Sequence, residues 1–209
     1  MYDVVIIGAG VAGTMIAREL SRYQLKLLMV DRQNDVGNET TAANSAIIHA
    51  GYDALSTKLK GKFNAPGNAM FDQICEELNV PFKRIGSLVV AFDEKDRAKL
   101  QELYENGLRN HVPDMKIIER DEVLEMEPNL NSSICCALYA PTAGIIEPWE
   151  LAAAASENAQ DNGAELSLET EVKDIKKLQD GSYRVITNRG EVDTQYIISC
   201  AGVYADKIN

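Results

Sequence analysis

The opening stretch of the chain, residues 1–32, constrains the fold more than any other part. Residues 4–7 form a short, wholly apolar run rich in β-branched side chains, which is typical of a parallel strand buried on both faces. Gly8, Gly10 and Gly13 follow this run in the order G-x-G-x-x-G. A helix is expected over residues 14–23 and a second strand over residues 25–30. The stretch therefore predicts a strand-helix-strand unit of an α/β fold.

Each glycine of this pattern has its own expected role. Gly8 permits a tight turn, Gly10 lets the backbone approach a pyrophosphate, and Gly13 lets the helix pack on the strand. The N–H groups and dipole at the start of the helix then face the phosphates. Asp31 ends the second strand 23 residues after Gly8, close to where a carboxylate accepts hydrogen bonds from a ribose 2′-hydroxyl. The stretch predicts an adenine dinucleotide as ligand, with NADP the least favoured, rather than a glycine-rich turn of an unrelated α/β unit.

Composition and charge limit the other classes of function. The chain has 209 residues, of which 45% are apolar, enough for a packed globular core. Its 21 basic and 32 acidic residues give a net charge of −11 and form no long run of one sign. This balance argues against a nucleic acid or an anionic membrane as the main partner. An anionic substrate would need a local basic pocket.

The sequence also predicts where the protein is found. No apolar run approaches the ~20 residues that cross a bilayer, so no integral membrane segment is expected. Met1 leads directly into the first strand without a signal peptide, which predicts a cytoplasmic protein.

The cysteines offer no metal site. Cys75, Cys135, Cys136 and Cys200 form no C-x-x-C pair, and the adjacent Cys135 and Cys136 are poorly placed to bridge each other. They are expected to be reduced and mostly buried. No metal site is predicted.

His49 is the candidate for acid–base chemistry. It follows a polar loop over residues 32–44 and lies in the small-residue segment 43–52, where close approach to a flat ring is possible. His49 is expected to act as a general base or hydrogen-bond donor; the alternative is a structural histidine at a strand end. The only other histidine, His111, is expected on the surface at a helix end.

The pattern of expected helices and strands changes in the middle of the chain. A helix is expected over residues 57–79, with a possible interruption at Pro66-Gly67. An α+β segment is expected after it. Its strands are expected over 82–85, 87–92, 116–118 and 134–139, and its helices over 94–108 and 120–126, the second with Asp121 as a possible cap. Arg84 is the candidate contact for an anion, and a surface ion pair is an equal alternative.

The last part returns to an α/β pattern. A helix is expected over 150–162, with Trp149 beside it in the core. Strands over 165–168, 170–178, 183–187 and 191–199 predict a β-meander, in which Val172 faces an adenine ring with its backbone N–H and C=O. Residues 196–200, the Ala201-Gly202 turn and a helix beginning at residue 203 repeat the strand-glycine-helix order of the opening stretch.

Four segments together resemble one known family. They are residues 8–13 (GAGVAG), 44–51 (NSAIIHAG), 144–148 (GIIEP) and 198–206 (ISCAGVYAD). Over nearly its whole length the chain resembles the FAD-dependent oxidoreductases of the D-amino-acid oxidase type. Residues 84–91 (RIGSLVVA) and the His-Ala-Gly segment look most similar to the branch containing glycerol-3-phosphate dehydrogenases and L-2-hydroxyglutarate oxidases.

The resemblance implies a fold and a set of cofactor contacts. The fold class is α/β: a Rossmann-like FAD-binding domain, made of a parallel sheet plus a β-meander over residues 1–79 and 141–209, with an inserted α+β segment over 80–140 that forms part of a substrate or cap domain. The cofactor is FAD. The residues implied to contact FAD are Gly8, Gly10, Val11, Ala12, Gly13, Asp31, Arg32, Thr41, Ser45, Val172, Ala201 and Gly202.

The resemblance also implies an activity. The expected reaction is oxidation of a small anionic secondary alcohol by hydride transfer to flavin N5, with His49 as base, Arg84 as substrate contact and electrons leaving to an unidentified acceptor. Glycerol 3-phosphate is the favoured substrate. The alternatives are an L-2-hydroxyglutarate or other 2-hydroxy-acid oxidase, an amino-acid or amine oxidase, and an inert flavin-binding module or one that serves RNA modification.

Two features depart from the family pattern. Asp31 stands where a glutamate is more usual, which shortens the reach of the carboxylate. Members of the family continue well past residue 209 with strands that complete the substrate domain. The chain is therefore expected to be an N-terminal fragment that is inactive by itself.

Overall fold

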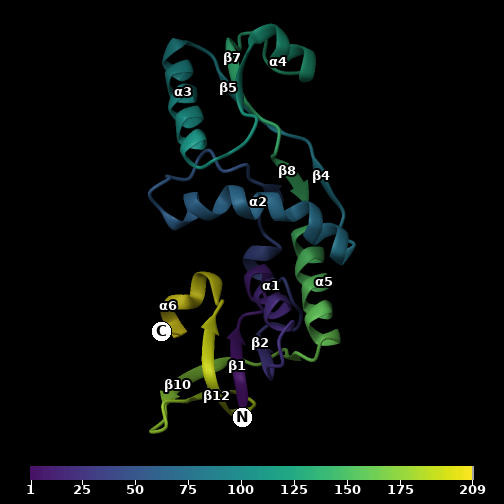
Figure 1. Cartoon of the computed structure of the whole chain (residues 1–209), viewed down its shortest axis with the longest axis vertical. Helices are drawn as coiled ribbons and strands as arrows, with labels where there is room; N and C mark the ends of the chain where they lie inside the picture. Colours follow the sequence, from purple (N-terminus) through teal and green to yellow (C-terminus); the bar gives the residue numbers. More distant parts are fainter. Residues whose placement is uncertain (209) are drawn as a thin grey trace. The chain divides into compact units, whose positions relative to one another are not determined.

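The computed structural model describes residues 1–208, which form two compact units (Figure 1). The first unit contains Met1–Ser45, Leu78–Val80 and the residues from Glu147 on. The second unit contains Ala46–Glu77 and Pro81–Ile146. Residues 46–77 thus belong to the same compact unit as the predicted insert. The predicted domain division had assigned them to the FAD-binding domain. Compactness does not reveal which segments contact a cofactor, so the predicted domain roles stay predictions.

A six-stranded sheet forms the centre of the first unit. Its order is β10-β11-β12-β1-β2-β9. The strands are β1 (Tyr2–Ile7), β2 (Leu27–Val30), β9 (Glu165–Ser167), β10 (Val172–Lys177), β11 (Tyr183–Thr187) and β12 (Gly190–Ser199). β1 pairs in parallel with β12 and β2, and β2 pairs in parallel with β9. β10, β11 and β12 are antiparallel neighbours, which confirms the predicted meander for these three strands. The strand expected over residues 165–168 is β9, which lies beside β2 and not in the meander.

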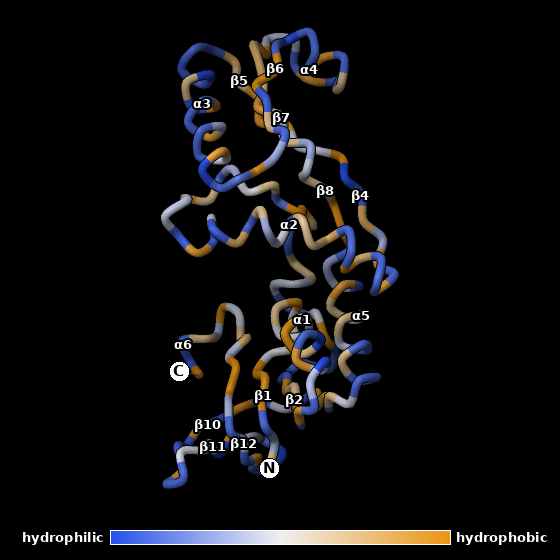
Figure 2. The backbone as a smooth tube through the Cα atoms, in the orientation of Figure 1, coloured by the Kyte–Doolittle hydropathy of each residue, from blue (hydrophilic) through white to orange (hydrophobic). Residues whose placement is uncertain are grey.

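Both faces of β1 and β2 are buried, as the apolar runs predicted. Val4, Ile6, Leu27 and Met29 pack on one face with Ala17 and Ala159 from helices α1 (Val11–Leu20) and α5 (Pro148–Asp161). Side chains of the other face form a second cluster that also contains the partly buried Ile208. Ile208 ends the short helix α6 (Ala205–Ile208), which follows the 3₁₀ turn η2 (Gly202–Tyr204). Figure 2 shows β1 and β2 as hydrophobic segments of the backbone.

The second unit contains two small antiparallel sheets and three helices. One sheet has the order β3-β8-β4, made of Ile47–Ile48, Gly144–Ile146 and Phe82–Arg84. The other has the order β5-β7-β6, made of Ser87–Ala91, Cys136–Ala140 and Lys116–Glu119. The helices are α2 (Leu59–Leu78), α3 (Glu94–Arg109) and α4 (Arg120–Met126). The predicted α+β character of this part is confirmed.

The first of these helices has no interruption at Pro66-Gly67, which the sequence had offered as a possibility. α2 runs unbroken through Pro66. Proline removes one helical hydrogen bond, which leaves the carbonyl of residue 62 without its usual donor. Both Pro66 and Lys62 are exposed, so water can satisfy that carbonyl and the helix continues.

Two further local expectations differ from the structure. The N-cap of α4 is Glu119, without a side-chain cap bond, and Asp121 lies instead in the first turn, where its charge favours the helix dipole. Trp149 is 53% exposed and not part of the core.

The four cysteines are free, as expected, with Cys75 and Cys136 buried and Cys135 and Cys200 partly buried. The Sγ atoms of Cys135 and Cys136 lie 3.6 Å apart and form no bridge.

The predicted C-terminal helix starts later than expected, at Ala205, and its last predicted residue, Asn209, lies outside the described residues. Within residues 1–208, no helix is both long and apolar enough to cross a membrane. The same residues contain no group of three or more His, Cys, Asp or Glu side chains arranged to hold a metal ion.

Candidate functional site

The glycine turn between β1 and α1 is built from close backbone contacts. Gly8 has a φ of +107°, and a Cβ there would lie 2.4 Å from the carbonyl oxygen of Cys200. A Cβ on Gly13 would lie 1.9 Å from the carbonyl oxygen of Gly8. A Cβ on Gly10 would meet only the Thr41 hydroxyl, at 3.1 Å. Gly8 and Gly13 are therefore required by the fold, whereas Gly10 leaves open the space in front of the helix.

The start of α1 presents unused N–H groups in that space. Gly10 is the N-cap in an extended conformation without a side-chain cap bond, and the first turn holds no acidic residue. The Val11 N–H donates to Thr41 Oγ1 at 3.0 Å. The N–H groups of Ala12 and Gly13 donate to no other part of the described chain. Unused donors, a positive helix end and a missing Cβ together fit a phosphate group.

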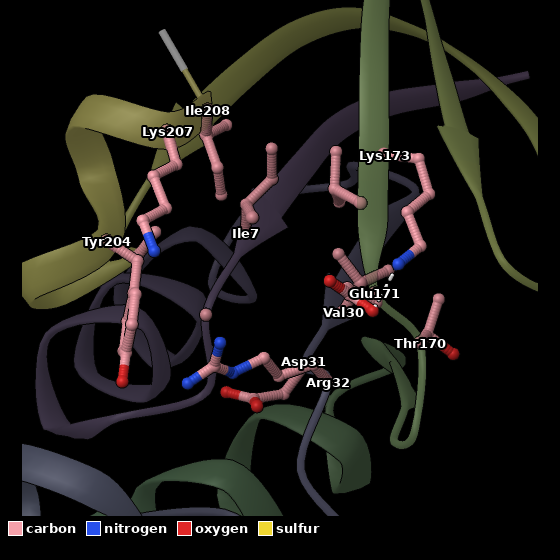
Figure 3. Close-up of a pocket in the computed structure, with 13 residues that line it drawn as sticks. Ile7, Val30, Asp31, Arg32, Thr170, Glu171, Lys173, Tyr204, Lys207 and Ile208 are labelled. Atoms are coloured by element: carbon pink, nitrogen blue, oxygen red, sulfur yellow. Dashed lines mark hydrogen bonds and ion pairs between the residues drawn. The ribbon is translucent and has the colours of Figure 1, made fainter.

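A pocket lies beside this turn, at the carboxyl ends of β1 and β2 (Figure 3). Open α/β sheets bind ligands at this edge of their parallel strands. Residues from three places in the first unit line the pocket: the ends of β1 and β2, the start of β10, and the segment from Ala201 through α6. Gly8, the first glycine of the turn that leads into α1, lines the pocket, so the turn joins the pocket to the start of the helix.

Asp31 is fixed at the edge of the pocket by two backbone donors. Its Oδ2 accepts the Ala9 N–H at 2.7 Å, and its Oδ1 accepts the Gln33 N–H at 2.9 Å. Each carboxylate oxygen has a further lone pair. The side chain is therefore oriented before any ligand binds, and it can accept hydrogen bonds from the hydroxyls of a sugar.

Arg32 lies next to Asp31 and is fixed by contacts of its own. Its guanidinium bonds Glu39 at 2.7 Å and lies 3.9 Å from the centroid of the Tyr204 ring. The bond to Glu39, followed by the one to Tyr204, raises the pKa of Arg32. The same pair lowers the pKa of the exposed Glu39 carboxyl. Across the pocket, Lys173 pairs with Glu171 (Figure 3), which lowers the pKa of that carboxyl.

The structure brings most of the predicted cofactor residues together. Gly8, Asp31, Arg32, Val172 and Ala201 line the pocket. Gly10, Val11, Ala12, Gly13 and the buried Thr41 surround the start of α1. Ser45 and Gly202 are exposed and are not in the lining. The cofactor role of each of these residues stays a prediction.

Sequence reasoning missed Tyr204 and Lys207, both of which line the pocket. The repeated strand-glycine-helix order predicted the element that carries them, but not that it faces the carboxyl end of β2. The aromatic residue within a helical turn of the Ala201-Gly202 pair was the signal that could have identified Tyr204.

His49 lies in the second unit, directly after β3, and its side chain is exposed. Its backbone carbonyl accepts a hydrogen bond from Asn68 Nδ2 at 2.9 Å. His111 is also exposed, immediately after the cap of α3, as expected. The role of His49 in acid–base chemistry stays a prediction.

Arg84 forms hydrogen bonds and an ion pair with residues of its own unit. Its guanidinium bonds Asp72 Oδ2 at 2.6 Å, Asn68 Oδ1 at 2.9 Å, the Asn68 carbonyl at 2.8 Å and the Thr142 carbonyl at 2.5 Å. The ion pair with Asp72 is the arrangement that the alternative interpretation of Arg84 predicts, and it lowers the pKa of the Asp72 carboxyl. Contact of Arg84 with a substrate anion stays a prediction.

We expect Arg84→Lys to lower the free energy of unfolding by about 2 kcal/mol, because a single ammonium cannot satisfy the partners of the planar guanidinium. Chemical denaturation measures this loss. The part due to Asp72 exists while that carboxyl is ionised and disappears as the pH falls below its ordinary pKa of 3.8. Arg189→Lys, at an exposed ion pair with Glu169, is the control. Equal losses in the two variants would contradict the structural role of Arg84.

Comparisons with known proteins add independent information. A family model described as FAD dependent oxidoreductase matches residues 3–209. The chain is 57% identical over 209 residues to a protein from Caloramator mitchellensis named glycerol 3-phosphate dehydrogenase, a match that covers 100% of this chain and 43% of that protein. It is 31% identical over 221 residues to the mitochondrial L-2-hydroxyglutarate dehydrogenase of Pongo abelii, which covers 100% of this chain and 52% of that protein.

A solved structure is similar as well. The dithionite-reduced L-α-glycerophosphate oxidase from Mycoplasma pneumoniae, with FAD bound, matches with a TM-score of 0.93 and 34% identity. The match covers 99% of this chain and 55% of that one. The chain thus spans about half the length of the relatives that it matches.

Proposed function

We infer that this chain, which belongs to the family of FAD-dependent oxidoreductases, supplies the FAD-binding part of an enzyme that oxidises glycerol 3-phosphate. The observation that carries the proposal is the 57% identity to a glycerol 3-phosphate dehydrogenase along the whole of this chain. The unused N–H groups at the start of α1 and the fixed carboxylate of Asp31 fit the diphosphate and the ribose of an adenosine diphosphate group.

The residues at the turn would bind and orient the cofactor. The N–H groups of Ala12 and Gly13 would donate to the pyrophosphate, and Asp31 would accept from the ribose hydroxyls. Bound FAD supplies a two-electron acceptor that takes a hydride at flavin N5. The predicted assignment of residues 1–79 and 141–209 to FAD binding, and of residues 80–140 to the substrate side, is part of this proposal.

His49 would act on the substrate alcohol. As the secondary alcohol becomes a ketone, its C–H hydrogen leaves as hydride and its O–H proton passes to the imidazole. Holding the proton acceptor and the substrate in line is the contribution that the protein makes to such a step. The electrons then pass to a separate acceptor. The cytoplasmic location and the lack of a nucleic-acid partner stay predictions.

The proposal is tested by anaerobic absorbance spectra of the complete enzyme that carries this chain, with FAD, before and after each substrate is added. Bleaching of the flavin band by glycerol 3-phosphate, and not by L-2-hydroxyglutarate or amino acids, is the expected result. Bleaching by L-2-hydroxyglutarate alone would favour the second candidate, which the 31% identity to an L-2-hydroxyglutarate dehydrogenase supports. Bound flavin that no substrate bleaches would overturn both.

A further inference from the structure

Three buried asparagine side chains in the second unit bond the same short stretch of backbone. Asn68 lies on α2, Asn106 lies on α3, and Asn110 is the C-cap of α3. Their exposed fractions are only 6%, 8% and 4%. All three direct their Nδ2 groups at carbonyl oxygens of residues 49–54, the stretch that begins with His49. We call this stretch the His49 loop.

The hydrogen bonds cover most of the carbonyls of the His49 loop. Asn68 donates to His49 O at 2.9 Å, and Asn110 donates to Gly51 O at 2.7 Å. Asn106 donates to the Tyr52 and Ala54 carbonyls at 2.7 and 2.8 Å, and Asn110 also reaches the Ala54 carbonyl at 2.6 Å. In the described chain, none of these four carbonyls accepts a backbone N–H. The asparagine amides thus supply the hydrogen bonds that backbone N–H groups would supply in a strand or a helix.

Steric contacts also restrict the same backbone. Ala50 is 1% exposed in the main apolar cluster of the unit. Gly51 has a φ of +117° and packs against Asn64 and Ala65 of α2. A Cβ on Gly61 would lie 2.3 Å from the Leu55 carbonyl oxygen, so α2 also approaches the end of the loop closely. The backbone is held by hydrogen bonds and by packing, while His49 stays exposed.

We propose that Asn68, Asn106 and Asn110 are positioning residues that fix His49 for proton transfer. This inference rests on the proposed function, because it assigns His49 its role there. Asn106 and Asn110 each bond two loop carbonyls that lie two or three residues apart, which uses both N–H donors of one planar amide. Asn68 uses its two donors on the His49 carbonyl and, outside the loop, on the Thr142 carbonyl. A hydroxyl or an alkyl group at these positions cannot supply that geometry. The arrangement gives an irregular loop the rigidity that catalytic groups require.

The first test measures the loop without any catalysis. Asn110→Ala leaves the Gly51 carbonyl without a donor and is expected to speed chymotrypsin cleavage after Tyr52 by about tenfold, the effect of one lost buried hydrogen bond. Cleavage after the exposed Tyr23 of the first unit is the internal reference. Asn162→Ala is the matched control, because Asn162 caps α5 as Asn110 caps α3, but its Nδ2 bonds Asn158 O of its own helix. Unchanged cleavage after Tyr52 in Asn110→Ala would overturn the proposal.

The second test measures the consequence for the reaction in the complete enzyme that carries this chain. Asn110→Ala is expected to lower the limiting rate of flavin reduction by about 10- to 100-fold, the loss that misplacement by about 1 Å can cause. The half-saturating substrate concentration should stay within about twofold, because substrate binding needs no precise imidazole position. If Asn110→Ala does not fold, Asn106→Ser, which keeps one donor, replaces it with the same expectations.

The outcomes separate this inference from the proposed function. A loosened loop with an unchanged rate, in an enzyme whose rate does depend on His49, would overturn the positioning role alone. A rate that does not depend on His49 would overturn the proposed role of His49 and the inference with it, whatever the loop does. Loss of rate in Asn162→Ala equal to that in Asn110→Ala would show a general effect of cap removal and would also overturn the inference.

Discussion

Replacing Gly13 by alanine is expected to destabilise the first unit by about 3 kcal/mol, the upper end for overpacking a close contact, and to abolish FAD binding. The new Cβ would lie 1.9 Å from the carbonyl oxygen of Gly8. That oxygen belongs to the backbone of the turn, so no side chain can move aside. Either α1 separates from β1 or the turn changes shape. Urea denaturation measures the stability, and quenching of flavin fluorescence measures the binding.

Gly10→Ala is the matched control, because the same methyl group would enter the site with little effect on the fold. Gly10 has a φ of −73°, which alanine adopts without strain, and its Cβ would meet only the Thr41 hydroxyl. We expect less than about 1 kcal/mol of destabilisation, within the range of ordinary substitutions, and a loss of FAD affinity. Full FAD affinity in Gly10→Ala would contradict the placement of the pyrophosphate at the start of α1. Equal destabilisation by the two substitutions would contradict the packing role of Gly13.

The glycine turn shows how far sequence reasoning reaches. A buried strand, the G-x-G-x-x-G turn, a helix and a second buried strand leave few ways to fold, because Gly8 and Gly13 relieve contacts that the backbone itself creates. The parallel pairing of β1 with β2, the carboxyl-end position of Asp31 and the meander of β10, β11 and β12 followed from such local patterns. These parts of the fold could be predicted because neighbouring residues determine them.

Contacts between distant segments could not be predicted in this way. Arg84 bonds Thr142, which is 58 residues away, and Asn110 bonds Gly51, which is 59 residues away. An asparagine near a helix end indicates a cap, and the sequence does not reveal that its amide also reaches a separate loop. Similarly, Tyr204 lines the pocket because β12, which precedes it, pairs with the distant strand β1.

Substituting each of the two histidines gives the sharpest test of the proposed chemistry. His49→Asn is expected to lower the rate of flavin reduction by glycerol 3-phosphate by about 10² to 10⁴-fold, the usual contribution of a positioned acid or base. Asparagine is polar and close to histidine in size, but it cannot take the proton of the substrate hydroxyl. Because the His49 side chain is exposed, the substitution should leave the free energy of unfolding nearly unchanged.

His111→Asn is the control within the same unit. His111 is exposed like His49, and its φ of +60° is one that asparagine tolerates well. We expect its rate of flavin reduction to equal that of the unchanged enzyme. Stopped-flow absorbance without oxygen measures both variants. A loss in His49→Asn no larger than that in His111→Asn would remove the base from the proposed mechanism and would favour oxidation of a neutral amine, which requires no strong base.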